Sequence, residues 1–154
     1  MSVFSHSDKQ KFRQSNYMII IGCGRLGANL ANTFSEEGKD VLVIDEDADA
    51  CRRLSPSFSG MFRHGDALDV DLLNEIGIQE ADVLICVTNN DNTNIMISQM
   101  AKEHFQVPHV ISRLYDPDRR SVYEELGIGN ICPSLLSANA IDHLLKSQKQ
   151  EATA

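Results

Sequence analysis

The chain has 154 residues, enough for one domain with a full hydrophobic core. Its formal net charge of -8 argues against nucleic-acid binding, which needs a basic surface. No apolar run reaches membrane-spanning length and no secretory signal pattern occurs, so we expect a cytoplasmic protein without direct membrane insertion.

Residues 1–16 are polar and lack periodicity, which predicts a flexible leader. The apolar, β-branched run Tyr17–Ile21 then predicts a strand buried on both faces. It ends in the turn Gly22-Cys23-Gly24-Arg25-Leu26-Gly27, and a helical pattern continues to Gly38. Val41–Ile44 is a second buried strand that ends on Asp45. The order strand, glycine turn, helix, strand and acid is typical of a nucleotide-binding unit.

Each glycine of this turn has a distinct expected role. Gly22 permits the tight turn, Gly24 lets a phosphate approach the backbone, and Gly27 lets the helix pack closely on the sheet. The bare helix N-terminus attracts an anion. Asp45, eighteen residues after Gly27, is placed to accept hydrogen bonds from ribose hydroxyls. We therefore predict an adenine-nucleotide site.

Arg25 adds a preference among nucleotides. A positive side chain at a helix start is disfavoured by the helix dipole, by about 0.3–1 kcal/mol, unless an anion lies there. Arg25 therefore favours AMP, ADP or ATP as the ligand, without excluding NAD(H).

The third unit follows Asp45. Ala48–Leu54 predicts a short helix that Asp47 caps, and Gly60–Arg63 predicts a third strand. Gly65-Asp66-Ala67 comes next, at the strand end where ligands bind in parallel sheets. These residues line the adenine, or they form a plain turn before the next helix, and the two interpretations are compatible.

A polar loop follows the fourth predicted strand, Val83–Val87. It contains Thr88, Asn89, Asn90 and Asn94, and with the strand order 3-2-1-4-5 it faces the glycine turn across the crevice. Its hydroxyl and amides can reach a ribose or phosphate. Asn and Asp are also the preferred caps of the helix that begins there, and the sequence leaves both roles open.

The second half of the chain continues the alternation. The predicted helix 91–105 has a broad apolar arc, which fits either a subunit contact or a thickly packed core. Arg113 ends the strand 110–114, where it complements phosphate charge or is an ordinary surface residue. A helix at 116–126, a strand at 128–132, a last helix from Pro133 and a flexible tail over 147–154 complete the chain. The fold class is thus α/β, a Rossmann-type, mostly parallel, doubly wound sheet of about six strands, within a domain at 17–146.

The sequence offers no catalytic or metal-binding pattern. The five histidines share no metal-ligand spacing, and there is no nucleophile elbow or P-loop lysine. The four cysteines lack a CxxC pair and are expected to be buried, reduced thiols. We therefore expect neither a catalytic residue nor a metal site.

Several segments together resemble a known family. The segments GCGRLG, VLVID, HGDALDVDLLNEIGIQEADVLICVTNNDNTN, VISRLYDP and LGIGNICPS are similar to the N-terminal domain of the TrkA/RCK (KTN) potassium transport regulators. The resemblance covers Tyr17 to Leu145. It implies a Rossmann lobe that binds AMP, ADP, ATP or NAD(H), dimerises, and changes the geometry of an attached membrane pore.

The resemblance also assigns roles by position. Gly22–Gly27 would hold the phosphates with direct contact from Arg25, Asp45 with Glu46 beside it would take the ribose, and Asp66 and Ala67 would lie at the adenine. Thr88, Asn89 and Arg113 would line the rest of the cleft, and the helices at 91–105 and 116–126 would form the dimer.

Two departures qualify these roles. Many members continue into a second regulatory lobe where this chain ends, which leaves open a separate full-length RCK partner. Some nucleotide-gated relatives have an acid where this chain has Ser134.

Two function classes follow from the sequence. The first is a cytosolic nucleotide-sensing regulatory subunit of a potassium channel or transporter, held at the inner membrane face through its partner. The second is a dinucleotide-binding subunit of an oxidoreductase whose catalytic part is another chain.

Overall fold

The computed structural model describes residues 16–152, with side chains as far as Ser147. The predicted leader therefore lies outside the described residues, apart from Asn16. The strands and helices alternate along the chain as β1 (Tyr17–Ile21), α2 (Arg25–Glu36), β2 (Asp40–Asp45), η1 (Ala48–Arg53), β3 (Met61–His64), α3 (Val70–Glu75), η2 (Ile78–Glu80), β4 (Val83–Cys86), α4 (Asp91–Gln99), η3 (Met100–His104), β5 (His109–Arg113), η4 (Pro117–Arg119), α5 (Arg120–Glu125), β6 (Gly129–Ile131) and α6 (Pro133–Ala152).

The strands form one six-stranded parallel sheet in the order β3-β2-β1-β4-β5-β6. β1 lies at its centre, paired with β2 on one side and β4 on the other. The order reverses between β1 and β4, which is the switch point of a doubly wound fold. The predicted Rossmann-type fold and strand order are confirmed.

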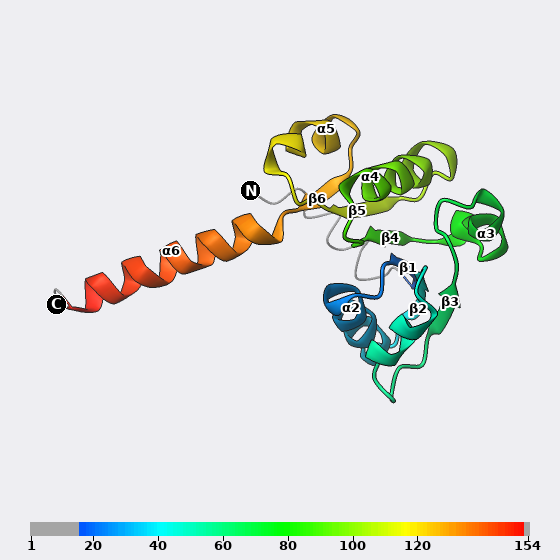
Figure 1. Cartoon of the computed structure of the whole chain (residues 1–154), viewed down its shortest axis with the longest axis horizontal. Coiled ribbons are helices and arrows are strands. Elements are labelled where there is room, and N and C mark those ends of the chain that lie inside the picture. Colours follow the sequence, from blue (N-terminus) through cyan, green and yellow to red (C-terminus); the bar gives the residue numbers. More distant parts are fainter. Residues whose placement is uncertain (1–15, 153–154) are drawn as a thin grey trace.

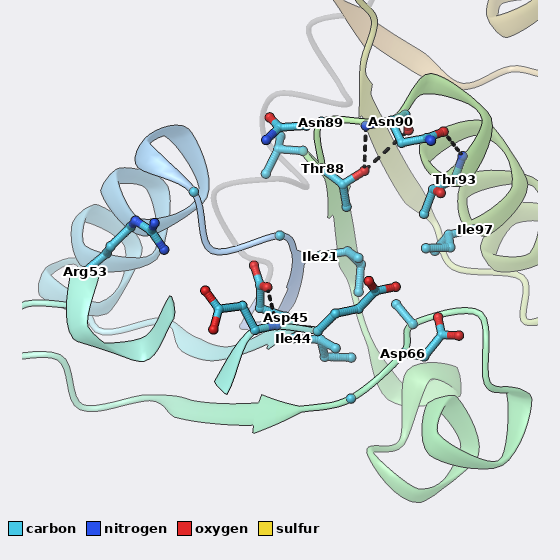
Figure 2. A pocket seen from close by; sticks show the side chains of 17 residues that line it. Ile21, Ile44, Asp45, Arg53, Asp66, Thr88, Asn89, Asn90, Thr93 and Ile97 are labelled. Atoms are coloured by element: carbon cyan, nitrogen blue, oxygen red, sulfur yellow. Dashed lines mark hydrogen bonds between the residues drawn. The ribbon is translucent and has the colours of Figure 1, made fainter. Parts of the chain in front are cut away.

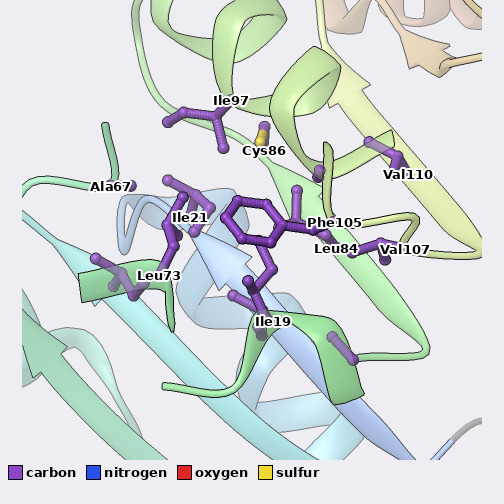
Figure 3. Close-up of a cluster of buried hydrophobic side chains, with 14 of the residues drawn as sticks. Ile19, Ile21, Ala67, Leu73, Leu84, Cys86, Ile97, Phe105, Val107 and Val110 are labelled. Carbon is purple, nitrogen blue, oxygen red and sulfur yellow. The ribbon is translucent and has the colours of Figure 1, made fainter. Parts of the chain in front are cut away.

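Alternate residues of β1 separate two cores. Ile19 and Ile21 pack with α3, α4 and Phe105 on one face (Figure 3), whereas Met18 and Ile20 pack with Ala28 and Ala31 of α2 on the other. The strand is apolar throughout because both of its faces are covered. Figure 1 shows α2 on one side of the sheet and α3 and α4 on the other.

Aspartate side chains cap the starts of three helical segments, including the predicted cap Asp47. The side chains of Asp47, Asp69 and Asp116 each accept a hydrogen bond from the backbone N–H two residues later, at the starts of η1, α3 and η4. These carboxylates are therefore part of the local fold rather than independent groups.

The helix predicted at 91–105 divides into α4 and a π-helical turn, η3. Ile97 and Ala101 are fully buried, which accounts for one part of the apolar arc. Met96 is 54% exposed and stays outside the core. Burial within the monomer therefore explains only part of the arc.

One cysteine differs from its predicted environment. Cys23, Cys86 and Cys132 are buried free thiols, but Cys51 is exposed on η1. The prediction was wrong for Cys51 because η1 is a short surface segment in which only Ala50 faces the core.

The last helix, α6, projects away from the body of the domain (Figure 1). It continues to Ala152, through residues for which a tail from 147 was predicted. Lys, Gln, Glu and Ala are strong helix formers, so the polar composition does not end the helix. Within residues 16–152, no helix has both the length and the apolar composition needed to cross a membrane.

Candidate functional site

A cavity of about 590 Å³ opens at the carboxyl ends of the central strands, at the switch point between β1 and β4. This volume is in the usual range for a small-molecule site, about 300–1,000 Å³. Figure 2 shows Asp45 and Asp66 on one side of it and Thr88, Asn89 and Asn90 on the other. The cavity brings together many of the predicted site residues: Gly22, Gly24, Asp45, Glu46, Gly65, Asp66, Ala67, Thr88, Asn89 and Asn90.

The glycine turn has the geometry that its sequence predicts. Gly22 has φ +99°, which disfavours any side chain, and its N–H donates to the Ile44 carbonyl at 2.8 Å. A Cβ on Gly27 would lie 1.8 Å from the carbonyl oxygen of Gly22, so α2 packs directly against the turn. A Cβ on Gly24 would meet no protein atom within 4 Å. The space beside Gly24 is thus free for a ligand.

The N-terminus of α2 faces this turn without a protein cap. Gly24 is its N-cap residue, with no side-chain hydrogen bond, and no acidic residue occurs in the first turn. Its first backbone N–H groups and the positive end of the helix dipole are therefore available to an anion.

Asp45 is held in place by the backbone. One carboxylate oxygen, Oδ2, accepts from the Cys23 N–H at 2.6 Å, and the other, Oδ1, accepts from the Asp47 N–H at 2.8 Å. Each oxygen has further lone-pair capacity, because a carboxylate accepts about four hydrogen bonds. The carboxylate lines the cavity with its orientation already fixed.

The opposite wall is a network of side chains that satisfy one another. Thr88 Oγ1 donates to Asn94 Oδ1 at 2.6 Å, and Asn90 Oδ1 accepts from the Thr93 N–H at 3.0 Å. Asn94 Nδ2 donates to the carbonyls of Thr88 and Arg113, and Asn94 is fully buried. Asn90 thus acts as the helix cap, whereas Asn94 fixes the loop to β5 and does not line the cavity.

Acidic residues dominate the charge around the cavity. Its lining includes Asp45, Glu46, Asp47 and Asp66, and among these lining residues the single cation is Arg53. Sequence reasoning did not identify Arg53 as a site residue. Its Nη1 lies 3.5 Å from the Cys23 carbonyl, so the end of η1 brings positive charge to the glycine turn. That proximity depends on how η1 folds back across α2, and no local pattern indicates it.

Four further predicted residues lie around the cavity without lining it. Arg25 is exposed at the start of α2, and Leu26 and Gly27 pack that helix against the sheet. The Arg113 guanidinium lies 4.4 Å from the centre of the Tyr115 ring.

Cys23 is another predicted site residue that does not line the cavity. Its side chain is buried, and its thiol donates to the Ala50 carbonyl at 3.4 Å. Burial, followed by the Asp45 charge, raises the pKa of Cys23 to about 11. At neutral pH Cys23 is therefore a protonated thiol and a poor nucleophile.

The floor of the cavity is apolar. Ile21, Ile44, Val87 and Ile97 contribute to it, and it suits the flat face of a base or ribose. In the part of the chain that the structure describes, no three His, Cys, Asp or Glu side chains are grouped closely enough to hold a metal ion.

Comparison with known proteins bears on this geometry. The model of the TrkA-N domain family matches residues 18–133. The Trk system potassium uptake protein TrkA of Streptomyces coelicolor is 43% identical over 115 residues, which cover 75% of this chain and 52% of that protein. The chain thus spans about half the length of this relative.

Solved structures agree on the fold. The TrkA-N domain of the inner membrane protein ybaL from Escherichia coli superimposes with a TM-score of 0.76 at 19% identity, covering 85% of this chain and 97% of that one. The Shewanella denitrificans Kef CTD in its AMP-bound form gives a TM-score of 0.70 at 22% identity, covering 90% and 95%. The GsuK channel bound to NAD superimposes with a TM-score of 0.75 at 22% identity, covering 88% of this chain and 24% of that one. The family match over most of the domain confirms the resemblance drawn from the sequence, and the chain belongs to the TrkA-N domain family.

Proposed function

We propose that this chain is a cytosolic nucleotide-sensing domain that regulates a potassium channel or transporter. The observation that carries the proposal is the pairing of Asp45 with the uncapped N-terminus of α2 at one cavity. A carboxylate for ribose hydroxyls beside a helix N-terminus for phosphate is the arrangement that an adenine nucleotide needs.

AMP, ADP or ATP, or else NAD(H), is the proposed ligand. Related folds are described as bound to AMP and to NAD, which supports this class of ligand. Gly22 and Gly24 would face the phosphates, Asp45 the ribose, and Gly65 to Ala67 the adenine. Arg53 would contribute the positive charge near the turn that sequence reasoning attributed to Arg25.

A regulatory role is favoured over catalysis by the residues that line the cavity. Hydride transfer to or from a nicotinamide requires a proton donor or acceptor beside the reacting group, a role that His takes most often and that Asp, Glu, Lys or Tyr can also take. The lining of the described cavity includes no His, Lys or Tyr, and the Asp45 carboxylate is already bound by two backbone N–H groups. The potassium assignment is supported by the name of the TrkA relative, which this chain matches over about half of that relative's length.

We further propose that the domain works as a dimer through α4 and α5. Met96 and Val122 are 54% and 45% exposed on these helices, where a partner subunit would cover them. Sedimentation equilibrium distinguishes a monomer from a dimer. A dimer is expected, and a monomer at all accessible concentrations would refute this part of the proposal.

Calorimetric titration with AMP, ADP, ATP, NAD+ and NADH tests the ligand assignment. Asp45→Ala is expected to weaken binding at least tenfold, about 1.4 kcal/mol, through loss of charge-assisted hydrogen bonds. Asp82→Ala is the matched control, because Asp82 also accepts two backbone hydrogen bonds but does not line the cavity. Equal affinity in wild type and Asp45→Ala would refute the site.

The regulatory role needs its own readout. When Asp45→Ala is placed in the gene that encodes this chain, potassium-limited growth is expected to change, whereas Asp82→Ala leaves it as in wild type. Hydride turnover with NAD(H) in the presence of a partner chain, with no effect on potassium uptake, would instead establish the oxidoreductase alternative.

A further inference from the structure

Tyr115 connects the rim of the cavity to a neighbouring loop. It follows β5, and its hydroxyl donates to Asn89 Oδ1 at 3.0 Å. Asn89 lines the cavity on the side opposite Asp45, and Tyr115 itself does not line it. Asn89 therefore lines the cavity and, through its amide oxygen, also holds a tyrosine outside it.

The backbone of Tyr115 is tied to two further elements. Its N–H donates to Asp91 Oδ1 at 2.9 Å, at the start of α4. Its carbonyl accepts from the Cys132 thiol at 3.7 Å, and Cys132 is the residue directly before α6. The Leu114 N–H donates to the Ile131 carbonyl at 2.8 Å, so the ends of β5 and β6 are joined at the same place.

The contact with Cys132 lies at the base of α6. Cys132 is 1% exposed, whereas the side chains from Leu136 to Lys146 are exposed. Figure 1 shows α6 extending from this base away from the domain. A small change at the base would therefore be amplified along the helix, since an α-helix rises about 1.5 Å per residue as one stiff rod.

We propose that Tyr115 is a positioning residue that couples occupancy of the cavity to the direction of α6. This inference rests on the proposed nucleotide function. A bound nucleotide competes for the Asn89 amide, and the Tyr115 hydroxyl is then released. Because the Tyr115 side chain is 44% exposed, loss of this hydrogen bond leaves the ring held mainly by the Arg113 guanidinium, 4.4 Å from the ring centre. Its carbonyl then shifts at the base of α6.

Hydrogen exchange at the first turn of α6 tests the coupling. The Leu136 N–H, which donates to the Cys132 carbonyl at 3.1 Å, reports on this base. In the ligand-free protein, Tyr115→Phe removes only the hydroxyl and is expected to raise exchange at Leu136 about fivefold, the effect of one neutral hydrogen bond. Asn92→Ala is the control, because it removes a 2.7 Å contact from Arg119 Nη1 that involves neither Asn89 nor Tyr115. Hydrogen exchange at Leu136 in the Asn92→Ala protein is expected to match wild type.

Saturating AMP, and NAD+ in a second series, gives the decisive comparison. We expect the nucleotide to change Leu136 exchange about fivefold in wild type and in Asn92→Ala. In Tyr115→Phe the nucleotide is expected to bind about fivefold more tightly, because no Tyr115–Asn89 hydrogen bond has to be broken, and to leave the exchange rate unchanged. A purely structural role of Tyr115 would not abolish this response.

Different results would contradict the coupling and the proposed function. A full wild-type response in Tyr115→Phe, or nucleotide binding without any change at Leu136 in wild type, would overturn the coupling and leave the proposed function intact. If calorimetry detects no AMP or NAD+ binding to wild type, the proposed function itself fails.

Discussion

The two ends of β1 are each held by an aspartate that accepts two backbone hydrogen bonds. At the carboxyl end, Asp45 divides them, with one N–H on each oxygen. At the amino end, Asp82 takes both on Oδ2, from Asn16 and Tyr17 at 2.9 Å each. Asp45 lines a cavity, whereas Asp82 only joins the start of β1 to the start of β4.

This comparison shows that the same hydrogen-bonding arrangement, an aspartate accepting from two backbone N–H groups, serves two purposes. Both carboxylates fix the backbone around the central strand. At Asp45 the strand is followed by a glycine turn that leaves open space, so the remaining lone pairs face a potential ligand. At Asp82 both backbone donors share one oxygen, and the carboxylate does not line the cavity. Function depends on what the surrounding backbone leaves exposed, and the residue type alone does not decide it.

The largest expected effect on stability comes from adding a methyl group near the carboxyl end of β1. Gly27→Ala places a Cβ 1.8 Å from the Gly22 carbonyl oxygen, so α2 must move away from the sheet. We expect a loss of about 3 kcal/mol or more in the free energy of unfolding, measured by urea denaturation, because the contact is with rigid backbone.

Gly24→Ala is the matched control for that prediction. Its backbone is extended and the new Cβ meets no protein atom within 4 Å, so stability is expected to match wild type. Nucleotide affinity is expected to fall, because the methyl group occupies the space beside the turn. A Gly24→Ala protein that unfolds as readily as Gly27→Ala would contradict the described turn.

A smaller effect is expected for Asn94→Ala, which tests the wall opposite Asp45. Asn94 makes hydrogen bonds with Thr88 and Arg113 and is fully buried. Its removal leaves buried groups without partners, and we expect a loss of about 2 kcal/mol in the free energy of unfolding. Thr93→Ala, a substitution of a neighbouring residue that lines the cavity, should lower the free energy of unfolding by less. If Asn94→Ala weakened nucleotide binding but left stability intact, its role would be direct contact with the ligand.

The smallest effect concerns the amino end of β1 and depends on pH. Hydrogen bonds from the backbone N–H groups of Tyr17 and Asn16 lower the pKa of Asp82 below 3.8, the ordinary value for an aspartate. Because the folded-state pKa is the lower one, this stabilisation is complete above pH 3.8 and is lost as the pH falls through the folded-state value. Asp82→Asn should lower stability by about 1 kcal/mol at pH 7 and reduce the loss of stability below pH 4. Parallel acid titrations of wild type and Asp82→Asn, followed by circular dichroism, check the difference.

Much of the fold followed from local sequence patterns. The apolar run of β1, the glycine turn and Asp45 are each recognisable within a few residues of sequence. The caps at Asp47 and Asp69 were predictable for the same reason. Parallel strands buried on both faces then leave few possible strand orders.

The rest of the site depends on contacts between distant segments. Arg53 reaches the turn from 30 residues along the chain, and no periodicity predicts that. Asn94 and Asn90 look alike in a polar loop, yet one is buried against β5 and the other caps α4. Exposure of Cys51 likewise follows from where η1 lies on the surface. Which polar side chain faces a cavity is decided by packing.

The central position of β1 also has a consequence for the order of folding. The contact between Asp45 and Cys23 closes a segment of 22 residues, whereas that between Asp82 and Tyr17 closes 65. Loop-closure entropy favours the shorter by about 1 kcal/mol. The glycine turn and its acid can therefore assemble while the ribosome is still synthesising β4, and the amino end of β1 stays open until that later strand arrives. During synthesis, the glycine turn and Asp45 can therefore meet before the opposite wall of the cavity, Thr88 to Asn90, has been made.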